Sequence, residues 1–430
     1  MLSVLILCEY ATLNGGERSM LSTLGGIARA GYQVCVAAPT SGPLAETLRS
    51  DGVEIVPFEP HDAQGVRRPL DELRRQLAEI FRRHRPALLH ANSLAMGRLS
   101  GPVTAEWSLP SLSHLRDIVT LSRQAIADLN CHTRLLAVSQ ATRQYHVARG
   151  LAGEKTYVLY NGIDLEQFRP RPATGYLHQQ LGLARDVPLI GTIGQISLRK
   201  GHDVLAAALA NLPSPTTRFG NLEAIQKPGS TLQPDGAPAC GSARNARQSA
   251  RKAASSLARR ASIPQWAGGE GVPFAWLIIG QRFSGKAESR QFEERLHQAA
   301  VGPLAGKVHF LGVRDDVSRI LNELTFLVHS ARQEPLGRVL LEAAAAGLAL
   351  VATDVGGTRE IFRPEDEAAC LIPPGDAQAM SAAIGTLLGD PTRRLRLGEN
   401  ARRRVEEAFD LKRAVAGLVE QYEFAVSIAN

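Results

Sequence analysis

The sequence predicts an α/β protein with two domains, each a doubly wound parallel sheet that carries helices on both faces. Short apolar runs bounded by turn residues alternate with stretches of helical periodicity, and this alternation occurs twice along the chain. The 430 residues are enough for two domains. Strands that alternate with helices favour parallel pairing, because a crossover helix carries the chain back to the same end of the sheet.

The expected strands fall into two sets, one for each domain. The first set lies at residues 3–7, 33–37, 54–57, 87–90, 111–114, 134–138 and 156–159. The second set lies at residues 188–193, 275–279, 308–311, 325–328, 349–352 and 369–372. Helices are expected between the strands, for example at 17–29, 69–84, 140–149 and 204–211, and two more follow the last strand at 392–408 and 411–426.

A turn-rich stretch at 160–171 separates the two sets of strands. It contains Asn161-Gly162 and Pro170, and Pro172 follows it directly. We therefore assign residues 1–165 to a first Rossmann-like domain, residues 172–408 to a second, and residues 409–430 to a terminal helix.

One segment, residues 214–270, breaks the pattern. It is rich in Ser, Ala, Gly, Pro and Arg and carries eight basic residues against three acidic ones, so it holds most of the net charge of +7. A βαβ unit needs only a short connection here, and the sequence therefore predicts a largely disordered insertion. Two interpretations remain open: a structureless spacer, or a basic arm that binds an anionic membrane or polymer.

Charge and cysteine usage limit the function classes. The calculated pI of 9.3 suits nucleic acid, an anionic membrane surface or an anionic substrate, but no nucleic-acid-binding motif accompanies it, so nucleic acid is not expected as a partner. The five cysteines have no CxxC spacing, which excludes a disulfide framework and a zinc site. We expect residues 1–8 to form the first strand rather than a secretory leader, because no basic region precedes this short apolar run and it ends in Glu9. No stretch of the sequence approaches the roughly 18 apolar residues that a membrane span needs. We expect a cytoplasmic protein that contacts the inner face of the membrane peripherally.

Two glutamates near the end of a strand are the most informative feature. Glu334 and Glu342 lie eight positions apart, across a turn formed by Pro335, Leu336 and Gly337 that opens a helix. The free N–H groups at a helix N-terminus favour phosphate, and carboxylates accept hydrogen bonds from hydroxyl groups. The arrangement suits a phosphorylated sugar. The alternative is a pair of solvated surface glutamates.

Other strand ends carry groups that suit the same ligand. Gly15 and Gly16 follow the first strand and open a helix, in a sequence that is not the GxGxxG of dinucleotide-binding proteins. Lys200 follows the first strand of the second domain, and the alternative for it is an exposed lysine at a helix start. His114 and Arg116 follow another strand, where alternate residues share a face.

The segment EPLGRVLLEAAAAG (334–347), followed by TDVGGTREI (353–361), resembles the donor-site signature of retaining, family-four (group 1) glycosyltransferases of the GT-B fold. The resemblance implies that Glu334, with its Pro335-Leu336-Gly337 turn, contacts the donor sugar and that Glu342 binds the ribose hydroxyls. It implies a Gly-Gly loop over the donor diphosphate. It also implies that the terminal helix crosses back onto the first domain.

The same resemblance assigns the basic residues, with one departure. Lys200 matches the lysine that neutralises the diphosphate leaving group, whereas Gln195 stands where the family usually has an arginine, a loss for which Arg199 is the candidate replacement. Either His114 or Arg116 takes the place near the reactive carbon of the sugar. His90-Ala91-Asn92-Ser93 resembles a loop that contacts the acceptor.

The function expected from this resemblance is retaining transfer of a sugar from a nucleotide-sugar to a cell-envelope glycan, a polysaccharide or a lipid-linked sugar. Fixed positive charge would stabilise the leaving group, so neither a catalytic metal nor a cofactor is expected. Three alternatives remain: a sugar-nucleotide epimerase of the same fold, an inactive GT-B protein that only binds nucleotide-sugar, and an NAD-dependent dehydrogenase. The last is the least favoured, because the Gly-rich fingerprint is absent after the first strand of each domain.

Overall fold

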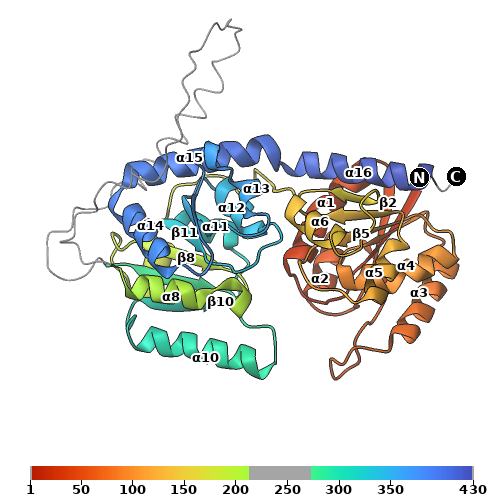
Figure 1. Ribbon diagram of the computed structural model, residues 1–430, viewed down its shortest axis with the longest axis horizontal. Helices are drawn as coiled ribbons and strands as arrows, with labels where there is room; N and C mark the ends of the chain where they lie inside the picture. The colour runs from red at the N-terminus through yellow and green to blue at the C-terminus, as the bar shows by residue number, and fades with distance from the viewer. Residues whose placement is uncertain (1, 213–272, 429–430) are drawn as a thin grey trace, which may run out of the picture.

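The computed structural model describes residues 2–212 and 273–428, and the expected insertion at 214–270 lies outside the described residues. Figure 1 shows two α/β domains side by side, spanned along one face by the last two helices. Leu212 and Phe274, on either side of the undescribed segment, pack in one apolar cluster.

The first domain contains a sheet of seven parallel strands in the order β3-β2-β1-β4-β5-β6-β7. The strand order reverses between β1 and β4, and ligands bind at the carboxyl ends of the strands at such a switch point. The strands are β1 (Leu2–Leu7), β2 (Tyr32–Ala38), β3 (Glu54–Pro57), β4 (Leu88–Ala91), β5 (Ser111–Leu115), β6 (Arg134–Ala137) and β7 (Thr156–Val158). The helices are α1 (Gly15–Arg29), α2 (Pro43–Ser50), α3 (Leu70–His84), α4 (Leu94–Glu106), α5 (Arg123–Asn130) and α6 (Gln140–Val147).

The second domain contains a sheet of six parallel strands in the order β10-β9-β8-β11-β12-β13, with its switch point between β8 and β11. Its strands are β8 (Leu189–Ile193), β9 (Ala275–Ile279), β10 (Val308–Gly312), β11 (Phe326–His329), β12 (Leu350–Thr353) and β13 (Cys370–Ile372). Its helices are α7 (Tyr176–Leu181), α8 (His202–Ala210), α10 (Ala287–Val301), α11 (Val317–Glu323), α12 (Arg338–Ala345), α13 (Thr358–Ile361), α14 (Ala377–Gly389) and α15 (Pro391–Ala408).

The last helix, α16 (Leu411–Ser427), leaves the second domain and packs on α1 of the first (Figure 1). Leu418, Tyr422 and Ala425 join the apolar cluster beneath α1. Gly26 of α1 allows the two helices to approach closely, since a Cβ atom at this position would lie only 2.6 Å from the Val415 side chain of α16.

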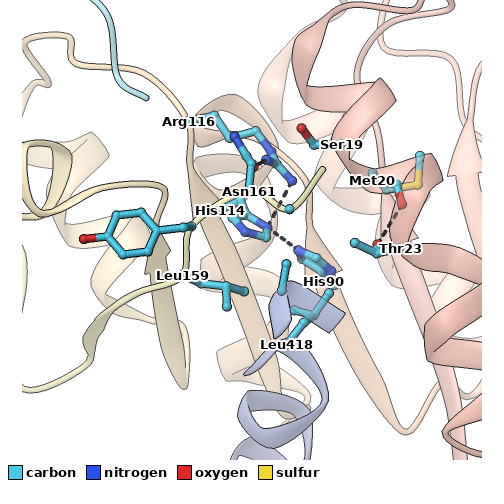
Figure 2. A pocket seen from close by; sticks show the side chains of 12 residues that line it. Ser19, Met20, Thr23, His90, His114, Arg116, Leu159, Asn161 and Leu418 are labelled. Carbon is cyan, nitrogen blue, oxygen red and sulfur yellow. Dashed lines mark hydrogen bonds between the residues drawn. The ribbon is translucent and has the colours of Figure 1, made fainter. Parts of the chain in front are cut away.

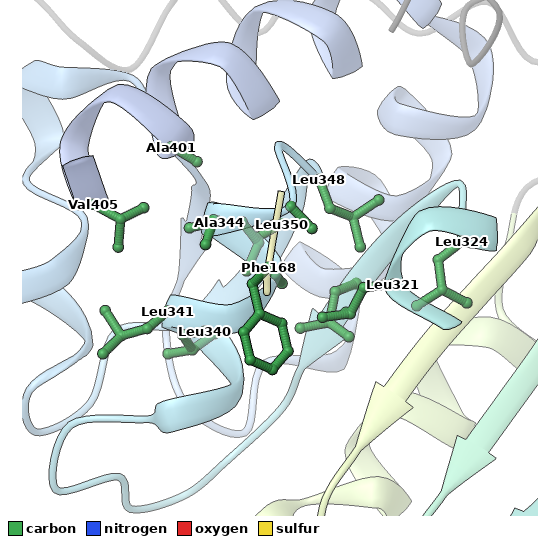
Figure 3. Packing of buried hydrophobic residues seen from close by; sticks show 14 of the residues in the cluster. Phe168, Leu321, Leu324, Leu340, Leu341, Ala344, Leu348, Leu350, Ala401 and Val405 are labelled. Carbon is green, nitrogen blue, oxygen red and sulfur yellow. The ribbon is translucent and has the colours of Figure 1, made fainter. Parts of the chain in front are cut away.

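Apolar clusters cover the faces of both sheets, as expected for parallel strands that are buried on both sides. Figure 3 shows one of them in the second domain, where Phe168 from the interdomain junction lies in the same cluster as Leu321, Leu340 and Leu348. The junction is thus held by the core of the second domain.

The predicted fold class is confirmed, and every expected strand is present within about two residues of its expected bounds. Within residues 2–212 and 273–428, no helix is long and apolar enough to cross a membrane.

Candidate functional site

The switch points of the two sheets bring together most of the residues predicted for the site. Gly15 and Asn92 follow β1 and β4, while Lys200 and Glu334 follow β8 and β11. A hydrogen bond of 3.3 Å from Arg338 Nη1 to Ser19 Oγ joins the second domain to the first at this point.

Glu334 lies at the centre of a buried, charged cluster in the second domain. Lys200 Nζ donates to its Oε2 at 2.5 Å, and His329 Nε2 lies 2.8 Å from the same oxygen. Burial alone would raise the pKa of Glu334, but Lys200 and His329 hold it below the ordinary value. Burial lowers the pKa of His329 to about 3, so its ring is neutral and donates from Nε2. Oε1 of Glu334 therefore remains available.

The turn after Glu334 depends on close packing of glycine. Gly337 precedes α12 with φ of 93°, and a Cβ atom there would lie 2.7 Å from Leu340. Gly357 donates its N–H to the carbonyl oxygen of Glu334 at 3.0 Å, and a Cβ on Gly356 would lie 1.9 Å from that oxygen. The two glycines of the 353–361 motif thus hold the loop that carries Glu334, while Pro335 and Leu336 are buried beneath it.

Glu342 is the fifth residue of α12 and is buried. Arg338, one turn earlier, donates from Nε to Glu342 Oε1 at 2.8 Å. Burial raises the pKa of Glu342, and the pairing with Arg338 only partly offsets this effect. We call Lys200, His329, Glu334, Arg338 and Glu342 the second-domain cluster.

The segment after β8 brings only one of its polar side chains into this cluster. Lys200 ends a short 3₁₀ helix, and Gly201 follows with φ of 65°, where a Cβ atom would lie 2.0 Å from the Ser330 carbonyl oxygen. Gln195 and Arg199 are partly buried and make no side-chain hydrogen bond within the described chain. Arg199 is nevertheless close enough to lower the pKa of Glu334 slightly, after the larger effects of burial and Lys200.

The Gly-Gly pair opens α1 as expected. Gly15 has no neighbour within 4 Å of its Cβ position, whereas a Cβ on Gly16 would lie 3.2 Å from the Arg116 side chain. Gly16 thus leaves space for Arg116. Glu17, the third residue of α1, accepts a hydrogen bond from the backbone N–H of Asn14 at 3.1 Å.

The sequence analysis left His114 and Arg116 as alternatives for the position near the reactive carbon of the sugar. In the structure the two side chains contact each other. His114 Nδ1 lies 2.7 Å from His90 Nε2 and 3.3 Å from Arg116 Nη2 (Figure 2). His90 Nδ1 lies 2.6 Å from the hydroxyl of Tyr422 on α16. We call His90, His114, Arg116 and Tyr422 the first-domain cluster.

Arg116 is a partly buried cation whose hydrogen bonds in the described chain go to neutral acceptors. It donates to the carbonyl and side-chain oxygens of Asn92 and to Asn161 Oδ1, each at 2.9 Å. Burial lowers its pKa to about 10, so the guanidinium stays charged at neutral pH. Arg338 is one of the charges that perturb the pKa of Arg116, which indicates that the two clusters face each other.

A small cavity of about 20 Å³ lies against the first-domain cluster. His90, His114 and Arg116 form part of its lining, together with Tyr160 and Asn161 from the interdomain junction (Figure 2). This volume holds roughly one water molecule.

A separate contact joins the domains at Glu360 of α13. Its carboxylate accepts the N–H groups of Gln140 and Ala141, at the start of α6, at 2.7 and 2.8 Å. The Tyr160 hydroxyl donates to the same carboxylate at 2.9 Å. A carboxylate at a helix N-terminus satisfies free N–H groups and complements the helix dipole.

The sequence analysis missed His329, Arg338 and Tyr422 as site residues. His329 ends a strand five residues before Glu334, and Arg338 precedes Glu342 by one helical turn, so local spacing could have indicated both. Tyr422 has no such signal, because only the path of α16 brings it to the first domain.

Comparisons with known proteins identify the family of the chain. A family model described as Glycosyltransferase Family 4 matches residues 13–167, and one described as Glycosyl transferases group 1 matches residues 249–390. The chain is 26% identical over 436 residues to phosphatidyl-myo-inositol mannosyltransferase of Mycolicibacterium smegmatis, covering 97% of this chain and 92% of that relative.

Other matches are shorter. The chain is 38% identical over 87 residues to MMP alpha-(1->4)-mannosyltransferase of Mycolicibacterium hassiacum, which is 20% of this chain and 21% of that relative. It is 31% identical over 137 residues to lipopolysaccharide core biosynthesis mannosyltransferase LpcC of Rhizobium leguminosarum, covering 32% of this chain and 39% of that relative.

Solved structures share the fold. Anabaena Alr3699/HepE in complex with UDP and glucose matches with a TM-score of 0.75 at 21% identity, over 98% of this chain and all of that one. WaaG, a glycosyltransferase involved in lipopolysaccharide biosynthesis, matches with a TM-score of 0.65 at 18% identity, over 97% and 99% of the two chains. With two family models that match residues 13–167 and 249–390 and with its GT-B fold, the chain belongs to the group 1 glycosyltransferases.

Proposed function

We propose that this glycosyltransferase moves a sugar from a nucleotide-sugar to a glycan or lipid-linked acceptor of the cell envelope, with retention of configuration. The observation that carries the proposal is the second-domain cluster, in which two buried carboxylates stand at the start of α12 beside the amine of Lys200. Hydroxyl groups need acceptors, and a diphosphate needs positive charge. The cluster offers acceptors from the two glutamates, and positive charge from Lys200 and from the N-terminus of α12.

The hydrogen bonds leave one oxygen of each carboxylate for a ligand. Lys200 and His329 both contact Oε2 of Glu334, and Arg338 contacts Oε1 of Glu342. Oε1 of Glu334 is then the acceptor for a sugar hydroxyl, and Oε2 of Glu342 is the acceptor for the ribose. Their partners hold both carboxylates in place before the ligand binds, which reduces the entropy lost on binding.

Charge on the departing nucleoside diphosphate is balanced by several groups in this proposal. Lys200 and Arg199 lie on the second-domain side, and the N-termini of α1 and α12 add positive dipole ends. Arg116 adds a further cation, which hydrogen-bonds Asn92, Asn161 and His114 rather than a carboxylate in the described chain. Arg116 therefore supplies charge that Gln195 does not. The proposal requires no metal and no cofactor.

The acceptor class rests on relatives and on surface charge. Phosphatidyl-myo-inositol mannosyltransferase and the lipopolysaccharide core enzymes are named for lipid-linked or envelope acceptors. On α3, Arg75 and Arg83 are both exposed, about two turns apart. Arg83 is paired with Glu79, and the exposed Arg75 suits contact with an anionic lipid surface at the inner face of the membrane.

A protein that binds nucleotide-sugar without transferring it is the second candidate, and Gln195 in place of an arginine favours it. Incubation with UDP- and GDP-sugars, with and without an envelope lipid extract, separates the possibilities. An acceptor-dependent product with the anomeric configuration of the donor, read by proton NMR, supports the proposal. An inverted product contradicts retention, conversion of the donor alone indicates an epimerase, and binding without conversion indicates the inactive protein.

A further inference from the structure

A chain of buried side chains connects the first-domain cluster to the C-terminal helix. Tyr422 of α16 contacts His90 at the end of β4, and His90 contacts His114 in β5, with the distances given above. Tyr422 is fully buried, and His90 and His114 are 2% and 4% exposed. Figure 2 shows the two imidazole rings in line, with Arg116 above His114.

Arg116 fixes the direction of these hydrogen bonds. A guanidinium has only donors, so His114 Nδ1, 3.3 Å from Arg116 Nη2, must be the acceptor and carries no proton. His90 Nε2 must then donate to the same nitrogen. A neutral imidazole has one N–H, so His90 Nδ1 is an acceptor and the Tyr422 hydroxyl donates to it. The remaining proton of His114 lies on Nε2.

Both rings are neutral in this arrangement. Burial, with the nearby Arg116 charge, lowers the pKa of His90 to about 3 and the pKa of His114 well below its ordinary value. A second proton on His114 would also place its Nδ1–H against two other donors, His90 Nε2–H and Arg116 Nη2. In the described chain, the side chain of His114 hydrogen-bonds His90 and Arg116 through Nδ1 alone, so its Nε2–H is left for a ligand.

We propose that His90 and Tyr422 are positioning residues that hold His114 in the Nε2–H tautomer, which makes α16 a functional part of the site. This inference rests on the proposed function, and on the expectation from the family resemblance that the place near the reactive carbon of the sugar belongs to His114 rather than Arg116. A fixed Nε2–H donates to an oxygen of that sugar, whereas the other tautomer would present a lone pair to it.

The alternative is that Tyr422 only fills space and satisfies its own hydroxyl. Tyr32 offers a matched control, because its ring packs edge to face against Tyr422 at 5.5 Å and its hydroxyl makes none of the hydrogen bonds of the chain. Tyr422→Phe and Tyr32→Phe each remove one hydroxyl from the same aromatic pair. Only the first removes a donor from His90.

Nitrogen NMR of protein labelled with ¹⁵N-histidine tests the tautomers directly, because protonated and unprotonated ring nitrogens have well-separated shifts. His90→Gln and His114→Gln assign the signals. At about pH 7 the wild type should show both rings neutral with the proton on Nε2. Tyr422→Phe should shift or split the His90 and His114 signals, and Tyr32→Phe should leave them unchanged. A doubly protonated ring or an Nδ1–H tautomer of His114 in the wild type would overturn the proposal.

Transfer kinetics test the consequence. Tyr422→Phe should lower kcat by roughly three- to tenfold with little change in the donor KM, and Tyr32→Phe should not. His90→Leu should lower kcat by at least as much, while His90→Gln, which keeps a donor facing His114, should recover most of it. Equal kcat values for Tyr422→Phe and Tyr32→Phe would overturn the positioning role. Because the spectra need no donor, a wild type without transfer would count against the proposed function and leave the tautomer result intact.

Discussion

The two clusters that face each other in this enzyme use opposite electrostatic designs. In the second-domain cluster, the cations Lys200 and Arg338 are paired with carboxylates. In the first-domain cluster, the cation Arg116 is held by neutral oxygens and by the neutral ring of His114. We interpret the difference as a division of work. On one side, carboxylates that are paired with cations present acceptors to hydroxyl groups. On the other side, phosphate and sugar meet a neutral N–H and the Arg116 cation, which Glu17 offsets through space but which hydrogen-bonds only neutral groups in the described chain.

The two glutamates of the second-domain cluster also differ from each other. Lys200 and His329 hold the pKa of Glu334 down against the effect of burial, whereas burial raises the pKa of Glu342 despite Arg338. The folded protein therefore favours the ionised form of Glu334 and disfavours that of Glu342. Glu334 stabilises the fold, and Glu342 is kept ionised at a cost that ligand binding can offset.

The largest expected effect comes from removing the amine of the second-domain cluster. Lys200→Ala should reduce kcat by roughly 10²- to 10³-fold and weaken donor binding less, because charge on the diphosphate grows as the glycosidic bond breaks. Lys200→Arg should retain part of the rate, and the exposed Lys412→Ala serves as the control. A wild-type kcat in Lys200→Ala would show that Arg116, Arg199 and the helix dipoles suffice.

The contrast between the glutamates predicts opposite effects on stability. Glu334→Gln should lower the free energy of unfolding by roughly 3 kcal/mol at pH 7, because Lys200 and His329 outweigh the cost of burying this carboxylate, and its loss leaves Lys200 without its anion. For Glu342 the cost of burial outweighs the pairing with Arg338. Glu342→Gln should leave it unchanged or raise it. Urea unfolding measures both, with the exposed Glu399→Gln as the control.

The pH dependence should differ in sign as well. The stability that Glu334 contributes is present above its unfolded pKa, near 4.5, and is lost as pH falls through its lower folded value. The cost of Glu342 is present above its raised folded pKa and disappears as pH falls below about 4.5, so any advantage of Glu342→Gln should vanish there. Parallel pH profiles for the two variants would contradict the assignment.

A smaller effect is expected at the interdomain contact between Glu360 and the start of α6. Glu360→Ala removes the carboxylate that accepts the N–H groups of Gln140 and Ala141, and a lost helix cap costs about 1 kcal/mol. Hydrogen exchange at these two amides should accelerate, while exchange in α12 stays unchanged. Unaltered exchange at Gln140 and Ala141 would show that Glu360 does not hold α6.

The sequence could predict the geometry of those candidate site residues that lie close together along the chain. Glu334, Gly337 and Glu342 lie within one strand–turn–helix unit, so their spacing determines their geometry. The strand ends that carry Gly15, His114 and Lys200 were also predicted, because apolar runs bounded by turns mark buried parallel strands.

The rest depends on contacts between distant segments. The spacing did not reveal that Lys200 pairs with Glu334, 134 residues away, since this requires β8 and β11 to be neighbours. Tyr422 and His90 are 332 residues apart and meet only because α16 crosses to the first domain. The roles of Gln195 and Arg199 stay predictions, as neither makes a side-chain hydrogen bond in the described part of the chain.

The central claim is that Glu342 binds the nucleotide and Glu334 binds the sugar. Calorimetric titration of Glu342→Gln and Glu334→Gln with a nucleoside diphosphate and with the matching nucleotide-sugar tests it most directly. Glu342→Gln should weaken both ligands by roughly 1.5–3 kcal/mol, because it loses a charge-assisted hydrogen bond to the ribose. Glu334→Gln should spare the nucleoside diphosphate and weaken only the nucleotide-sugar. If both variants bind both ligands as the wild type does, the two glutamates do not form the donor site and the account is contradicted.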